Sequence, residues 1–348
     1  METSSNWTNL PLDLLALIFK RLTFSDQVRF GCVCRLWFVI ASQKPYPPAP
    51  ELPWLLLRNN TWYLPERPHY EFFSLQENRI YKVNRLPEFR YTGKIRGFHE
   101  GWCLTQYRIA NAYESFYLLN PFSKVKIRLA DLFGVISDVT KAVIFSSNKY
   151  MIVAVLFADG NLAFCKVGDS EWYVPVPTQY RRFVDITFYK GKLYALRETK
   201  LDVIFVDEAL LPQMVDTINI PQGQNYAKDE YLVECGNDLL VVKRYYKHII
   251  GCTALFDVFK LQENQTTRWT KVENLSDQIL LVLGRDSSLS VPAEMFPGLK
   301  ESQIIFHVHD SDDLAVYSLE DGTIKPFFTP LPNPRLVNPM CVKPMCAS

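Results

Sequence analysis

The chain has 348 residues, which is longer than a typical single domain, so its length alone predicts about two domains. Apolar residues make up 48% of the sequence and charged residues 22%, a composition typical of a soluble globular protein rather than a disordered one. The 38 basic and 37 acidic residues leave a net charge of +1. This balance gives no electrostatic footprint for a nucleic acid or an anionic membrane, so we expect neither as a partner.

A short apolar run covers residues 14–19, and Lys20 and Arg21 follow it. A secretory signal carries its basic residues before the apolar stretch, so this run does not predict export. No run approaches the roughly 20 apolar residues that span a bilayer. The eight cysteines are scattered, and we interpret them as reduced thiols, which places the protein in the cytoplasm, the nucleus or both.

The first part of the chain predicts three helices. Pro in the first turn and a preceding Asn favour a helix over residues 11–22. Ser25 offers a new N-cap for a short helix over residues 26–30, and Gly31 is suited to close it in the left-handed conformation. A third helix is expected over residues 32–42.

These helices carry more apolar surface than they can bury among themselves. A helix that is apolar nearly all round must be covered on more than one side. A module of about 35 residues cannot do this alone and needs disulfides, a metal or a partner. Cys32 and Cys34 cannot hold zinc by themselves, because no second Cys/His pair stands nearby. The pattern therefore predicts that one apolar face is buried within the module and another in a partner protein.

The same residues resemble a known motif. Leu10-Pro11, Ile18-Phe19, Val28-Arg29-Phe30 and the ending Val33-Cys34-Arg35-Leu36-Trp37 are similar, in order and spacing, to the F-box, especially its plant form. The resemblance implies an F-box over residues 9–43 that binds the Skp-type adaptor of a Skp–cullin–F-box (SCF) ubiquitin ligase. The matching positions that it implies for adaptor contact are Leu10, Pro11, Leu14, Ile18, Val33, Cys34 and Trp37.

The chain changes character after this module. Residues 44–53 contain five prolines in ten positions and predict an extended linker. Beyond it, apolar strands alternate with tight turns, and strands recur near residues 72, 116, 162, 202, 256 and 315. Their spacing averages about 49 residues, and periods of about 40–50 with several short strands are typical of propeller blades.

We therefore expect a small all-α module followed by an all-β domain, a β-propeller of about six blades over residues 54–330. A β-sandwich is the alternative, although this region is long for one. A parallel α/β sheet is disfavoured because no helical pattern alternates with the strands. Residues 331–348 are rich in proline and predict a disordered tail that holds Cys341 and Cys346.

A second resemblance covers roughly residues 54–330. Segments such as Gly101-Trp102, Asp185-Ile-Thr-Phe-Tyr-Lys-Gly-Lys-Leu-Tyr194 and Val316-Tyr-Ser-Leu-Glu-Asp-Gly322 are similar, in the expected order, to the plant KIB-type domain. That family combines a β-propeller with an F-box, which agrees with the repeat pattern.

Catalytic motifs are not apparent. The sequence lacks the glycine-rich nucleotide loops and the His-Glu-x-x-His zinc motif. His307 and His309 would share one face of a strand, and we interpret them as polar strand-edge residues rather than a metal pair. Asp310, Asp312 and Asp313 fit a solvated hairpin loop. We therefore predict no metal, no cofactor and no catalytic residue.

Two basic-aromatic clusters are candidates for binding a target protein. Exposed Arg and Tyr in propeller loops are typical binding anchors and suit an acidic or phosphorylated segment. The candidate residues are Arg181, Arg182, Lys243, Arg244, Tyr245 and Tyr246.

The two resemblances together imply a non-catalytic substrate-recognition subunit of an SCF E3 ubiquitin ligase. The F-box would bind the adaptor and, through it, the cullin, while the propeller would bind a target that the sequence does not name. One alternative is a propeller-type hydrolase, which clustered carboxylates along the central channel would support. A second alternative is an F-box scaffold that never meets a cullin.

Overall fold

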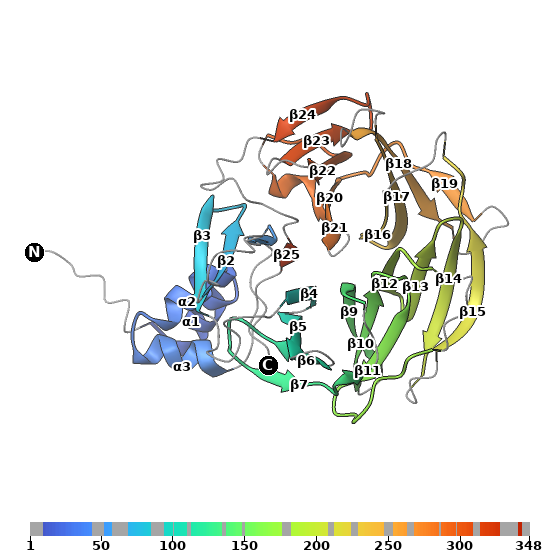
Figure 1. Ribbon diagram of the computed structural model, residues 1–348. Helices are drawn as coiled ribbons and strands as arrows, with labels where there is room; N and C mark the ends of the chain where they lie inside the picture. The colour runs from blue at the N-terminus through green and yellow to red at the C-terminus, as the bar shows by residue number, and fades with distance from the viewer. Residues whose placement is uncertain are drawn as a thin grey trace, which may run out of the picture.

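The computed structural model consists of three helices followed by a ring of β-sheets (Figure 1). The residues that the structure describes are 10–43, 52–57, 69–84, 94–99, 101–109, 113–133, 137–147, 150–175, 182–207, 212–223, 229–246, 253–262, 268–284, 287–296, 298–308, 314–327 and 340–342. Within them, no helix is long and apolar enough to cross a membrane.

The predicted helices are present, but their ends differ. They are α1 (Leu12–Phe19), α2 (Phe24–Gly31) and α3 (Arg35–Gln43). Thr23 occupies the N-cap position of α2, so the predicted cap at Ser25 is wrong. Gly31 ends α2 without a positive φ, which corrects its predicted left-handed conformation. Its role is close packing, because a Cβ at this position would lie 3.3 Å from the Cβ of Ala41 on α3.

The three helices share a small core of their own. Leu15 and Phe19 of α1 pack with Phe30 of α2 and Ile40 of α3. The ring of Trp37 stacks on Phe30 with 4.2 Å between centroids. These side chains supply the single buried face that the helical pattern predicts.

The strands form six sheets, which confirms the propeller of about six blades. Blade 1 contains β1 (Trp54–Leu57), β2 (His69–Ser74), β3 (Arg79–Asn84) and β25 (Met340–Val342). Blade 2 contains β4 (Lys94–His99), β5 (Trp102–Ile109), β6 (Tyr113–Leu119), β7 (Lys126–Arg128) and β8 (Leu132–Phe133). Blade 3 contains β9 (Val139–Ser147), β10 (Tyr150–Phe157) and β11 (Leu162–Lys166).

The remaining three blades complete the circle. Blade 4 contains β12 (Asp185–Tyr189), β13 (Lys192–Arg197), β14 (Lys200–Val206) and β15 (Pro212–Asn219). Blade 5 contains β16 (Asp229–Cys235), β17 (Asp238–Tyr246), β18 (Thr253–Leu261) and β19 (Trp269–Lys271). Blade 6 contains β20 (Gln278–Gly284), β21 (Ser287–Pro292), the 3-10 helix η3 (Ala293–Met295), β22 (Gln303–His307), β23 (Leu314–Ser318) and β24 (Ile324–Phe327).

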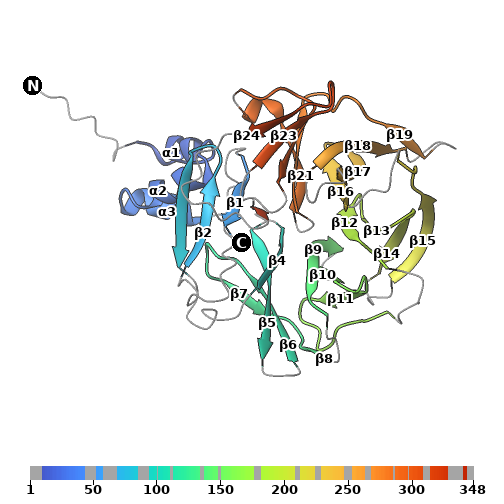
Figure 2. The same ribbon diagram turned by 45° about the horizontal axis from the view of Figure 1, so that its top comes forward.

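The innermost strands surround the centre of the ring. In circular order they are β25, β4, β9, β12, β16 and β21, and each contacts the next (Figure 2). Between neighbouring blades lie six buried apolar clusters, one at each junction among the described residues. Each blade therefore buries both of its faces, as a closed ring of sheets requires.

The six strand positions that the sequence marks each fall in a different blade, on β2, β6, β11, β14, β18 and β23. The longest interval between them, the last, has a structural cause. In blade 6, β20 and β22 pair in parallel, and the hairpin strand β21 and η3 lie between them in the chain. This extra hairpin lengthens the final repeat.

The ring is closed by the two ends of the propeller region. In blade 1, β25 pairs antiparallel with β1, with Leu55 opposite Cys341. The predicted disorder of residues 331–348 is therefore wrong for 340–342, and the rest of that tail lies outside the described residues, as does most of the predicted linker. Leu52 and Pro53, at the end of that linker, are buried in the propeller.

A truncation series tests the closure. A chain that ends at residue 339 loses β25, and at about 1 kcal/mol for each ladder hydrogen bond we expect the free energy of unfolding to fall by about 2–4 kcal/mol. A chain that ends at residue 342 keeps β25 and serves as the control. Urea denaturation followed by tryptophan fluorescence measures both. Equal stability of the two chains would contradict closure by β25.

Candidate functional site

The module of three helices presents an unusual amount of exposed apolar surface. Of the fifteen large hydrophobic side chains that are exposed among the described residues, eight lie within residues 10–43. They are Leu12, Leu14, Leu17, Ile18, Val28, Val33, Phe38 and Val39, and we call this set the apolar face. Its members are 37% to 59% exposed, although residues of these types are usually buried. Exposed apolar side chains in this number on so small a module favour an interaction surface.

The predicted adaptor-binding residues divide into two groups. Leu14, Ile18 and Val33 belong to the apolar face, and Pro11 is also exposed. Leu10, Cys34 and Trp37 are only half-buried. Leu10 and Trp37 pack against the core of the three helices, so much of their apolar surface is already used there.

Sequence reasoning missed five members of the apolar face: Leu12, Leu17, Val28, Phe38 and Val39. The spacing of Leu14, Leu17 and Ile18 at i, i+3 and i+4 could have pointed to Leu17, because residues so spaced share one side of a helix. Phe38 and Val39 follow Trp37 directly, and only the orientation of α3 shows that they face outward while Trp37 packs inward.

The cluster at the end of β17 is not the exposed anchor that the sequence predicts. Lys243, Arg244 and Tyr245 are all buried, so their predicted role as surface residues is wrong. The Nζ of Lys243 lies 2.8 Å from a carboxylate oxygen of Glu230. Burial and the nearby Asp257 raise the pKa of Tyr245.

Arg244 links blade 5 to blade 6. Its guanidinium lies 4.9 Å from the ring centroids of both Tyr246 and Phe306. It donates hydrogen bonds to the hydroxyl of Thr253 and to the carbonyl of His307. These contacts explain how a basic residue can occupy a buried position within β17, since cation–π and hydrogen-bond partners offset the cost of burying its charge.

Two of the candidate target residues remain accessible. Arg182 is exposed, and Tyr246 is half-buried with its hydroxyl donating to Asp229. Arg181 lies outside the described residues. The assignment of these residues to a target remains a prediction.

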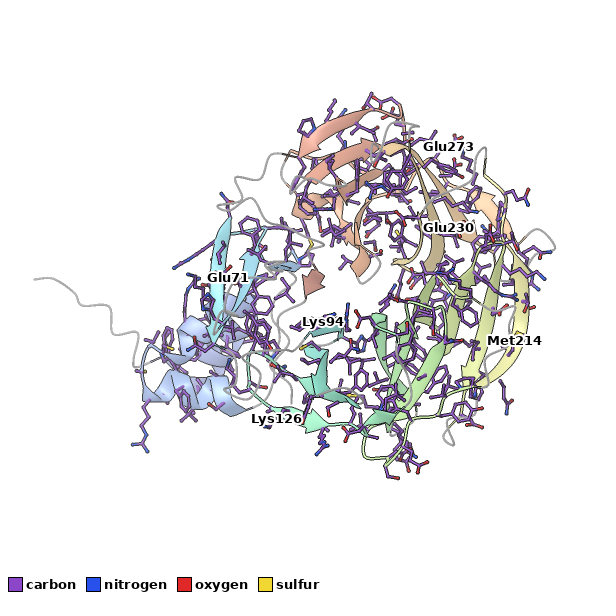
Figure 3. The ribbon with its side chains drawn as sticks, in the orientation of Figure 1. Glu71, Lys94, Lys126, Met214, Glu230 and Glu273 are labelled. Carbon is purple, nitrogen blue, oxygen red and sulfur yellow. The ribbon has the colours of Figure 1, made fainter. Side chains whose placement is uncertain are left out.

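The inner strands carry charged residues in pairs of opposite sign. Lys94 on β4 lies 3.1 Å from Asp138, just before β9, and Figure 3 places Lys94 near the centre of the ring. Lys141 on β9 donates to Asp185 on β12 over 2.6 Å. The described residues contain no group of three or more His, Cys, Asp or Glu side chains that could hold a metal ion. The charged residues named here on the described inner strands thus lie in pairs of opposite sign.

Asp185 connects three blades. It is fully buried on β12, accepts hydrogen bonds from Lys141 on β9 and accepts another from the backbone N–H of Leu232 on β16 at 2.7 Å. Burial raises the pKa of Asp185, and the charge of Lys141 opposes this effect. The carboxylate of Asp185 therefore holds neighbouring blades together, because it accepts hydrogen bonds from both of them.

Comparison with known proteins agrees with this architecture. Residues 72–318 match the KIB1-4 beta-propeller family, and residues 7–46 match the F-box domain. The chain belongs to the KIB1-4 β-propeller family. The match covers most of the ring, and the separate F-box match coincides with the three helices.

Several Arabidopsis thaliana proteins are similar to the chain over most of their length. "F-box protein At2g14290" is 26% identical to the chain, with 92% of this chain and 93% of the relative covered. "F-box/kelch-repeat protein KIB1" is 24% identical, with 90% and 81% covered. "Putative F-box protein At5g66830" is 22% identical, with 92% and 88% covered.

Removing the Asp185 carboxylate tests its structural task. Asp185→Ala leaves the ammonium of Lys141 and a backbone N–H of Leu232 buried without this acceptor, and we expect the free energy of unfolding to fall by roughly 3–5 kcal/mol. The matched control is Asp169→Ala, because Asp169 pairs with Lys166 at the surface. Such a pair contributes about 0–1 kcal/mol. Similar losses in the two variants, measured by urea denaturation, would refute the connection between blades.

Proposed function

We propose that this protein is the substrate-recognition subunit of an SCF E3 ubiquitin ligase. The F-box binds a Skp-type adaptor through the apolar face, and the adaptor links the chain to a cullin. The propeller holds the target protein. The apolar face is the observation that carries this proposal, because it is exposed in the isolated chain and needs a partner to cover it.

The energetics favour a tight contact. Full burial of one Leu, Ile or Val side chain contributes about 1.5–3 kcal/mol relative to exposure. The apolar face holds eight large side chains on three short helices, so burial of even half of them supplies the free energy of a stable complex. Membership in the KIB1-4 family, together with relatives named as F-box proteins, supports the same partner class.

The chain itself performs no bond chemistry in this proposal. Its contribution is proximity and orientation, because it holds a target close to a conjugating enzyme delivered by the cullin. The paired charges on the inner strands support this division of labour over the hydrolase alternative. The described cysteines are free thiols, which fits a complex that works in the cytoplasm or the nucleus.

We infer that the target binds the face of the ring that holds Arg182 and Tyr246. Tyr246 ends β17, the second strand of blade 5 counted from the centre. Arg182 lies against Gly160, in the turn that follows β10, the second strand of blade 3. Second strands run in the same direction in these blades, so both residues lie on one face. An acidic or phosphorylated segment would suit the exposed guanidinium of Arg182.

Charge placed on the apolar face tests the adaptor contact. We expect Ile18→Asp to weaken binding to a purified Skp-type adaptor by about 30-fold or more, because a central interface residue contributes roughly 2–4 kcal/mol. Ile324→Asp is the control, since Ile324 is similarly exposed but lies on the outer strand β24 of blade 6. Trp37 is a poorer choice because it packs against the core of the three helices.

Calorimetry with the full-length chain measures the affinity. Failure of the wild-type chain to bind the adaptor would end the ligase proposal. Adaptor binding without co-purification of a cullin would instead support the scaffold alternative.

A further inference from the structure

Helix α2 belongs to two packing units. Phe24, its first residue, is 5% exposed and is absent from the core that joins the three helices. It packs instead in the apolar cluster between blades 1 and 2, with its ring centroid 4.7 Å from Phe122 and 5.8 Å from Trp54. The F-box is therefore anchored in the junction between two blades, beside β2 and β3 (Figure 1).

Polar contacts lie next to this apolar anchor. The hydroxyl of Ser25, 4% exposed, donates a hydrogen bond to Glu77 in the turn between β2 and β3. Arg29, one helical turn later, donates to Glu77 at 3.3 Å and to the hydroxyl of Tyr81 at 2.6 Å. Tyr81 in turn stacks on Trp54 with 4.5 Å between centroids. Two residues of α2 thus bind a single turn of blade 1.

The charge state of Glu77 reflects these contacts. Burial acts to raise the pKa of this carboxyl, but hydrogen bonds from Ser25, Tyr81 and Arg29 outweigh it and lower the pKa below its ordinary value. A carboxyl whose pKa is lower in the folded protein than in the unfolded chain stabilises the folded, docked state. This stabilisation is complete above the unfolded pKa of about 4.3, and it is lost as the pH falls through the folded pKa. At neutral pH the ion pair with Arg29 is therefore in place.

The docking residues and the apolar face are separate. Phe24, Ser25 and Arg29 contact the propeller, whereas Leu14, Ile18 and Val33 are exposed and join neither the propeller clusters nor these polar contacts. An adaptor can therefore bind the apolar face while α2 stays docked. The contacts of α2 then give the F-box a fixed direction relative to the propeller.

We propose that Phe24, Arg29 and Glu77 form a fixed joint that orients the propeller within the ligase, so that they are positioning residues for ubiquitin transfer. This inference rests on the proposed function. Transfer depends on how often a target lysine reaches the conjugating enzyme, and a fixed joint concentrates that encounter on a small set of lysines. With a loose joint, many different lysines would reach the conjugating enzyme, and ubiquitin transfer to each of them would be slower.

The test uses the full-length chain with Phe24→Ala and Arg29→Ala, each compared with Arg35→Ala. Arg35 is also an exposed arginine of the F-box, and no described contact joins it to the propeller. We expect hydrogen exchange in α2 and in the turn at 75–78 to rise about tenfold in the first two variants. Adaptor affinity should stay within twofold of wild type. The melting temperature of the propeller should stay within about 2 °C of wild type in Arg29→Ala only, because Phe24→Ala also opens a cavity in the apolar cluster between blades 1 and 2. Phe24→Leu, which keeps an apolar side chain, should restore most of the protection.

The functional measurement is self-ubiquitylation in a reconstituted ligase, with the modified lysines identified by mass spectrometry. We expect a narrow set of modified lysines in the wild-type chain and in Arg35→Ala, and a broader set modified at a several-fold lower rate in the joint variants. Unchanged exchange and an unchanged lysine pattern in both joint variants would overturn the fixed joint. Exchange is measured without the adaptor, so failure of wild type to bind the adaptor would overturn the proposed function separately.

Discussion

The pairing of β1 with β25 is the constraint on which the rest of the molecule depends. Each blade buries both faces against its neighbours, so a ring opened between blades 6 and 1 would expose the apolar cluster that joins them. The same blade also carries the F-box, because Trp54 of β1 packs against Phe24 of α2. Closure of the ring and placement of the F-box therefore both depend on the four-stranded sheet of blade 1, and a change in β1 affects both.

Local patterns in the sequence were enough to predict the architecture. The three helices and one strand in each of six blades could be predicted, because helix periodicity and strand–turn repeats are properties of neighbouring residues. The strand at 340–342 was not readable. It has only three residues, and its partner is nearly 290 positions earlier in the chain, so nothing local distinguishes it from a tail.

The candidate site residues were harder to predict, for a different physical reason. In an ordinary two-layer protein, polar residues on a strand mark its solvent face. In a propeller both faces of a blade are buried, so Lys243 and Arg244 can point into the junctions between blades and find Glu230 or aromatic rings there. A run of basic and aromatic residues therefore has the same sequence pattern whether it forms a binding surface or packs between two blades. The F-box motif also does not predict side-chain orientation. It includes Trp37, but the sequence does not show that this side chain packs inward against Phe30.

The exposed apolar face and the docked helix α2 lie on different sides of the same small module. Its core of Leu15, Phe19, Phe30 and Ile40 is too small to stabilise three short helices strongly. Docking through Phe24 and Arg29 adds contacts on one side, and an adaptor on the apolar face would add them on the other. A partner that binds only the folded module stabilises it by mass action. The F-box is therefore most stable when both sides are occupied.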